Sequence, residues 1–94
     1  MANTRTKSDT TYNGWKNRAT WNCALWLDND YGLYSAAVAF TKSWIAKRGK
    51  KGGVYAAFIR AQGMDSEKTG DGFKWLSRDL DYKALNENMF EMVS

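Results

Sequence analysis

Few side chains of this chain are of the kinds that catalyse reactions. Its 94 residues include no histidine, and Cys23 is the single cysteine. A serine or cysteine nucleophile paired with histidine is therefore excluded, as is a histidine base near neutral pH. Zinc sites need several Cys or His ligands, which one cysteine cannot supply. Asp79 and Asp81 are close in sequence, but nothing around them predicts the shifted acidity that acid–base catalysis requires. We expect a protein that is not an enzyme and that uses no metal or cofactor.

The stretch DNDYG at 28–32 resembles the start of a calcium-binding loop. Such a loop needs glycine at its sixth position and glutamate at its twelfth, where this chain has Leu33 and Ala39. We therefore expect these carboxylates to cap helices at a junction rather than to bind calcium.

The stretch GKKGG at 49–53 resembles a phosphate-binding loop, but it lacks the spacing and the Ser or Thr of a P-loop. Two interpretations stay open. It is a plain surface loop, or it binds phosphate weakly at a helix start, where Gly52 and Gly53 offer backbone N–H groups beside Lys50 and Lys51.

Charge is unevenly distributed along the chain, whose net charge is +4. Residues 1–62 hold ten Lys or Arg against three acids, giving +7, whereas residues 63–94 hold four against seven, giving −3. This division predicts a positive face for an anionic partner and a negative C-terminal part. The alternative is that both are ordinary solvated faces.

Apolar spacing predicts an all-α fold, a single small bundle of four to five short helices. The expected elements are a helix over 18–27 capped by Asn17, one over 31–47, one over 53–62, a short helical turn at 73–76 and a last helix capped by Asp81 that reaches Val93. Because the first helix is apolar almost all round, we expect it to be central, with Trp21 and Leu25 in the core. A minor β-hairpin around 48–60 is the main alternative.

Polar residues 1–12 predict a flexible arm, followed by one helical domain over 13–94. The chain has no apolar run of the length that spans a bilayer, and we expect no leader of the signal-peptide kind. A single cysteine fits a reducing compartment. We expect no membrane contact and a location in the cytoplasm of a host cell.

A tryptophan-rich segment, NGWKNRATWNCALWLDND at 13–30, resembles the signature of a family of small proteins of phages, plasmids and other mobile elements. Ala19 departs from the pattern, since many members have an acidic residue there, and LDYKAL at 80–85 is a looser match to the family's closing helix. The resemblance implies a mobile-element product, and products of that size are often host-directed inhibitors. The residues that match are Gly14, Trp15, Asn17, Thr20, Trp21, Asn22, Leu25, Trp26, Leu27, Asn29 and Asp30. We expect most of the motif to be a folding signature, with Trp15 and Trp26 as the side chains that protrude.

The leading hypothesis is a host-directed inhibitor of a defence or nucleic-acid-processing complex, of the anti-CRISPR or antirestriction type, that acts by protein–protein contact. Tryptophan is a favoured interface anchor, and an acidic C-terminal part would occupy a basic nucleic-acid channel on the target. The candidate contact residues are Trp15, Trp26, Asp79, Asp81, Glu87 and Glu91. An outward Trp26 would equally serve a homodimer, so the oligomeric state stays open.

The second hypothesis is direct, sequence-nonspecific binding of DNA or RNA. The candidate residues are Lys42, Lys47, Arg48, Lys50, Lys51 and Arg60, with Arg5, Lys7, Lys16 and Arg18 in or beside the arm. Tyr55 or Trp44 would stack on bases. No known nucleic-acid-binding motif is present, and the C-terminal acids would repel phosphate. Steep dependence of affinity on salt would distinguish this hypothesis from the first.

Overall fold

Short polar residues start three of the four helices in a computed structural model, which describes residues 14–94. The side chains of Asn17, Asp30 and Asp81 accept a hydrogen bond from the backbone N–H three residues on, as N-caps do. Asp30 also ends the helix before it, as the junction at 28–32 predicts. The predicted arm at 1–12 lies outside the described residues.

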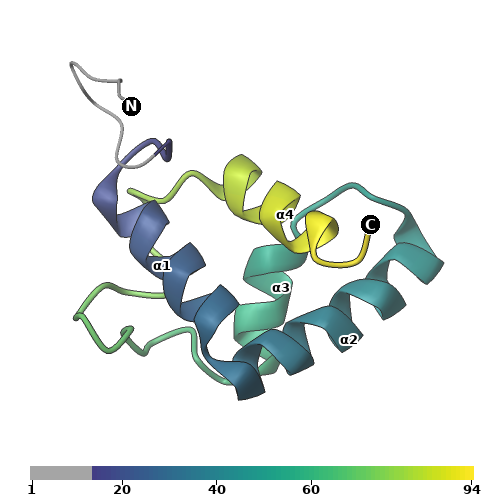
Figure 1. Cartoon of the computed structure of the whole chain (residues 1–94), viewed down its shortest axis with the longest axis horizontal. Coiled ribbons are helices and arrows are strands. Elements are labelled where there is room, and N and C mark those ends of the chain that lie inside the picture. Colours follow the sequence, from purple (N-terminus) through teal and green to yellow (C-terminus); the bar gives the residue numbers. More distant parts are fainter. Residues whose placement is uncertain (1–13) are drawn as a thin grey trace.

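The described chain forms four α-helices and no strand. The helices are α1 (Arg18–Asn29), α2 (Tyr31–Arg48), α3 (Val54–Ala61) and α4 (Tyr82–Glu91). In Figure 1, α1 and α2 make a V, and α3 and α4 fill its opening. The prediction of a small all-α bundle is confirmed. The β-hairpin alternative for 48–60 is wrong, because Val54–Ala61 is helical and four of its eight side chains are buried.

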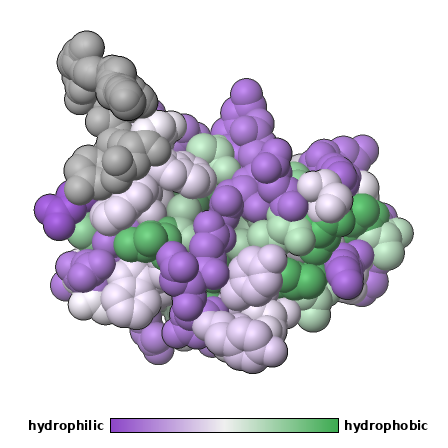
Figure 2. Space-filling view, in the orientation of Figure 1, coloured by the Kyte–Doolittle hydropathy of each residue, from purple (hydrophilic) through white to green (hydrophobic). Residues whose placement is uncertain are grey.

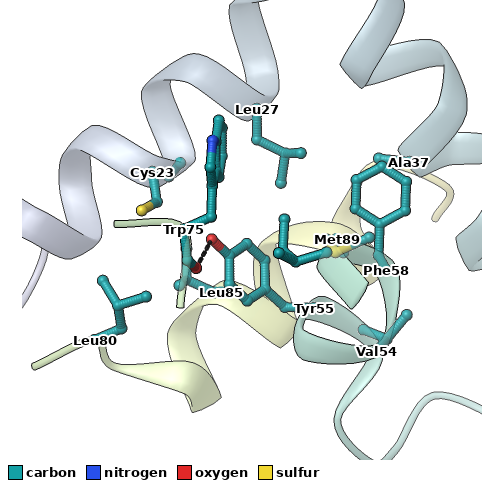
Figure 3. Packing of buried hydrophobic residues seen from close by; sticks show 12 residues of the cluster. Cys23, Leu27, Ala37, Val54, Tyr55, Phe58, Trp75, Leu80, Leu85 and Met89 are labelled. Atoms are coloured by element: carbon teal, nitrogen blue, oxygen red, sulfur yellow. Dashed lines mark hydrogen bonds between the residues drawn. The ribbon is translucent and has the colours of Figure 1, made fainter. Parts of the chain in front are cut away.

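All four helices contribute to one core (Figure 3): α1, α3 and α4 bury large side chains, whereas α2 buries Ala37 and packs partly buried Leu33, Phe40 and Trp44 against it. Leu27 of α1, Phe58 of α3 and Met89 of α4 are fully buried. The hydroxyl of Tyr55, also fully buried, donates to the backbone oxygen of Trp75 at 2.7 Å. That bond fastens α3 to the long connection between α3 and α4.

The buried face of α1 differs from the prediction. Thr20, Cys23, Ala24 and Leu27 are buried at the i, i+3, i+4, i+7 spacing of one helical face, and Asn22 is buried beside them. Trp21 and Leu25 are only half-buried, so the prediction that both lie in the core is wrong. Small and polar residues face inward because α1 packs closely against the connection at 62–81.

That connection contains no helix, so the turn of helix predicted at 73–76 is wrong. Its backbone bonds run across the loop instead: Thr69 N donates to Phe73 O at 2.7 Å, and Trp75 N donates to Glu67 O at 3.1 Å. An isolated bridge pairs Lys68 with Lys74. The apolar residues that suggested a helix are used differently, because Trp75 enters the core from an irregular backbone.

Candidate functional site

The tryptophan-rich motif of α1 holds the 62–81 connection in place. Asn17 Nδ2 donates to Asp79 O at 2.7 Å, and Thr20 Oγ1 accepts from Asp81 N at 2.9 Å. The hydroxyl reaches Asn17 locally, but it also fixes the chain at the start of α4.

Buried Asn22 joins the middle of the same connection. Its Nδ2 donates to Asp71 Oδ2 at 2.8 Å, and its Oδ1 accepts from Thr69 Oγ1 at 2.7 Å. The thiol of Cys23 donates to Lys74 O at 3.4 Å. Burial raises the pKa of the Cys23 thiol, so this cysteine stays protonated at neutral pH.

Trp26 is half-buried and closely held, rather than protruding as the sequence predicted. Its Nε1 donates to Asp71 Oδ2 at 2.9 Å, the same oxygen that Asn22 contacts. The backbone of Gly70 lies so close to the indole that a Cβ there would overlap the ring. The hydrogen bonds from Asn22 and Trp26 lower the pKa of Asp71, which therefore stays ionised at neutral pH.

The C-terminal end of α2 and the loop after it carry a hollow with a cationic rim. Its lining consists of Trp44, Lys47, Arg48, Lys51, Gly52 and Gly53. Trp44 Nε1 donates to Lys51 O at 2.8 Å, and the Arg48 guanidinium lies 4.7 Å from the Trp44 ring centre. Gly52 has φ 86° and would bring a Cβ to 3.1 Å from Trp44, so glycine is needed there.

We call Lys47, Arg48, Lys50 and Lys51, together with Trp44, the basic end. All four cations are exposed, and within residues 14–94 none of them has a carboxylate oxygen within 4.0 Å. Four of the six cations predicted to bind nucleic acid therefore lie together, and the other two do not. Arg60 lies in the last turn of α3, at the end of that helix away from the loop. Lys42 is outside the lining of the hollow.

Two aromatic residues were predicted to stack on bases. Tyr55 is fully buried, so that prediction is wrong for it. Trp44 is half-buried beside Arg48 and lines the hollow. Figure 2 shows hydrophobic side chains over α2, bordered by hydrophilic ones.

The acidic set predicted to meet a partner is divided between different places. Trp15, Glu87 and Glu91 line one hollow on α4, and the two glutamates also line a second one with Lys50. The Asp81 side chain is occupied as the cap of α4. Asp79 is exposed beside Asn17.

A further hollow, at the end of α1, contains Asp71, a residue that the sequence did not single out. Trp26 lines it with Leu25, Asn29, Asp30 and Asp71. Asp71 lies 45 residues from Trp26 in the chain, and no spacing rule connects them. The only indication of such a partner is that a half-buried indole N–H needs a hydrogen-bond acceptor.

A family model matches residues 8–94, which include the motif, the four hollows and all four helices. The chain belongs to DUF7249, a family of unknown function. No curated protein and no solved structure matches the chain. The family membership extends over the connection at 62–81 as well as α1, which fits the many bonds between them.

Metal-binding groups and membrane-spanning helices are absent from the described part of the chain. No group of three or more His, Cys, Asp or Glu there is placed to hold a metal ion. No helix within residues 14–94 has the length and apolar character needed to cross a bilayer.

Proposed function

We propose that this chain is a non-catalytic protein that binds nucleic acid through its basic end. The observation that carries the proposal is the group of four exposed cations around Trp44, none with a carboxylate partner in the described chain. Such a group attracts phosphates, and Arg48 and Trp44 offer flat surfaces on which a base can stack.

The start of α3 supports phosphate binding at the same place. Gly53 caps this helix without a side-chain hydrogen bond, and the first turn of α3 contains no acidic residue. The positive end of the helix is therefore uncompensated by its own side chains. Tyr55 N is already used by Asn86 Oδ1, at 2.9 Å, so the available N–H groups are those beside Gly53.

The acids of α4 limit the size of the binding surface. Glu87 and Glu91 line a hollow with Lys50 and would repel phosphates placed on that side. We therefore propose contacts with about four phosphates of a single strand rather than a long duplex footprint. For a single strand this corresponds to a slope of about −3 in log affinity against log salt.

Fluorescence anisotropy of a labelled 20-nucleotide single strand, titrated with the protein at several salt concentrations, tests the proposal. Between ~50 and ~200 mM salt, the affinity should fall about fiftyfold for four phosphate contacts. Replacing Lys47, Arg48, Lys50 and Lys51 by glutamine should abolish binding, with the helical circular dichroism retained.

A charge-matched control separates the basic end from net charge. Replacing Lys16, Lys68, Lys74 and Arg78 by glutamine also removes four exposed cations, all outside the basic end. This control should keep most of the affinity. Equal loss in both variants, or affinity that does not respond to salt, would refute the proposal.

The second candidate function is the host-directed inhibitor that acts by protein contact. It is favoured by the hollow at the end of α1, where an apolar wall lies beside two exposed carboxylates. Passing host lysate over the immobilised protein, with and without nuclease, tests it. A protein retained after nuclease would support protein contact, and capture that nuclease abolishes would support nucleic-acid binding.

A further inference from the structure

The hollow at the end of α1, here called the Trp26 hollow, has an apolar wall. It measures about 420 Å³, within the ~300–1,000 Å³ range of ligand pockets. Leu25 and the indole of Trp26 form its apolar part. The indole is fixed from two sides, by the Asp71 hydrogen bond and by the backbone of Gly70, so the wall exists before a ligand arrives.

Two carboxylates stand at the rim of this wall. Asp71 uses its Oδ2 for both Asn22 and Trp26, and within residues 14–94 its Oδ1 has no hydrogen bond. Asp30 uses its Oδ1 to cap α2 at Leu33 N, at 3.0 Å, which leaves its second oxygen for a ligand. Each carboxylate therefore offers a free acceptor atom.

The charges around the hollow favour a cation. The negative end of α1 points toward it, and α1 has no basic residue in its last turn. No Lys or Arg nitrogen of the described residues lies within 4.0 Å of Asp30 or Asp71. Arg18 acts on Asp71 only from a distance, since its guanidinium lies over the Phe73 ring at 5.5 Å. The opposing charge is the positive end of α2, which Asp30 partly offsets.

We infer that the Trp26 hollow binds an arginine side chain of a partner protein. The methylene stem of that arginine packs on Leu25, and its guanidinium lies over the Trp26 indole and donates to Asp71 and Asp30. Arginine fits better than lysine, because its planar group both stacks on an aromatic face and forks toward carboxylates.

Exposed Tyr31 indicates that the arginine belongs to a protein rather than to a free small cation. Tyr31 directly follows Asp30 and is 84% exposed, the one large hydrophobic side chain so open in the described chain. A neighbouring apolar residue of a partner would cover it, as aromatic anchors are covered in interfaces. The inference deepens the protein-contact function and rests on it only for the source of the arginine.

The peptide N-acetyl-Leu-Arg-Leu-amide is a suitable probe, with norleucine in place of arginine as its matched control. In the full chain labelled with ¹⁵N, the arginine peptide should shift the indole N–H signal of Trp26 saturably. The norleucine peptide should bind at least about fivefold more weakly, because it lacks the charge-assisted contacts. An unmoved Trp26 signal, or equal binding of both peptides, would overturn the inference.

Two conservative variants test the carboxylates without disturbing the fold. Asp30→Asn keeps an N-cap of equal quality, and Asp71→Asn keeps an oxygen that accepts from Asn22 and Trp26. The double variant should bind the arginine peptide about three- to tenfold more weakly. Asp65→Asn removes an exposed charge from the same connection, outside the hollow, and should change nothing.

Two other results would also decide the matter. Unchanged binding by the double variant would overturn the inference. A Trp26 signal that moves with protein concentration alone would mean that a second copy occupies the hollow, which also overturns it. The glutamine variant of the basic end should bind the peptide normally, so failure of nucleic-acid binding and failure of this inference are distinguishable.

Discussion

At the scale of single residues, the polar side chains of the motif form hydrogen bonds with residues that are far away in the sequence. Asn17 and Asn22 reach partners 62 and 49 residues away, and Thr20 reaches one 61 residues away. The sequence shows that such side chains need partners once buried. It does not show which partners, because only the packed fold brings 69–81 beside α1. Hydrogen bonds to neighbours in the sequence were therefore predictable, whereas these long-range hydrogen bonds were not.

Thr41 is the exception among the buried polar residues. It is fully buried on α2, and its hydroxyl has no hydrogen-bond partner in the described chain. Thr41→Val keeps the shape and removes the unsatisfied hydroxyl, so we expect the free energy of unfolding to rise by about 1 kcal/mol. Urea denaturation followed by tryptophan fluorescence measures this change.

The matched control is Thr20→Val, at an equally buried threonine whose hydroxyl has two partners. This substitution leaves Asp81 N without an acceptor and should cost about 1–3 kcal/mol. If Thr41→Val destabilised the protein as much as Thr20→Val, the Thr41 hydroxyl would have a partner after all.

At the scale of secondary structure, the helices were predictable and the connection was not. Asn17 and Asp81 are residue types that commonly cap the start of a helix, and each does so here. Gly49 ends α2 with φ 81°, a conformation that glycine often adopts after a helix. Residues 73–76 have apolar side chains at helical spacing, yet their backbone bonds cross to 67–69. Those bonds depend on partners that periodicity does not reveal.

The junction between α1 and the connection predicts a large effect for Asn22→Ala. The change leaves the Thr69 hydroxyl and Asp71 without the amide that joins them. We expect a loss of about 2–4 kcal/mol in the free energy of unfolding, measured by urea denaturation. Asn29→Ala removes only an exposed bond to Leu25 O and should cost less than about 1 kcal/mol. Equal effects would show that the buried junction contributes little.

The hydrogen bond from the Tyr55 hydroxyl to Trp75 O makes the free energy of unfolding depend on pH in the alkaline range. Burial raises the pKa of Tyr55 far above the ~10 of an unfolded tyrosine. Because the folded pKa is the higher one, the contribution of Tyr55 is complete below about pH 10. It is lost as the pH rises further, at up to about 1.4 kcal/mol per pH unit.

Urea denaturation of the wild type and of Tyr55→Phe between about pH 8 and pH 11.5 measures that dependence. The variant should lose about 1–2 kcal/mol at neutral pH, from the missing bond to Trp75 O. Above pH 10 its stability should fall less steeply than that of the wild type. Parallel curves would mean that Tyr55 ionises in the folded protein.

At the scale of the whole molecule, the charge division along the sequence does not become two separate faces within residues 14–94. Lys50 of the basic end and the acids Glu87 and Glu91 of α4 line one hollow. Four of the predicted cations lie together at the end of α2 and in the loop after it, because they are neighbours in the chain, whereas Lys42 and Arg60 lie elsewhere. No feature of the sequence indicated the Trp26 hollow, whose Asp30 and Asp71 meet only through the fold.

The five tryptophans provide the most direct test of nucleic-acid binding at the basic end. Each indole N–H gives its own signal in a ¹⁵N-labelled sample, so a titration with a 20-nucleotide single strand at low salt reports which surface is contacted. We predict that the Trp44 signal moves saturably and returns when salt is added, while the Trp26 signal stays in place. Movement of Trp26 or Trp15 instead of Trp44, or no movement at all, would contradict binding at the basic end.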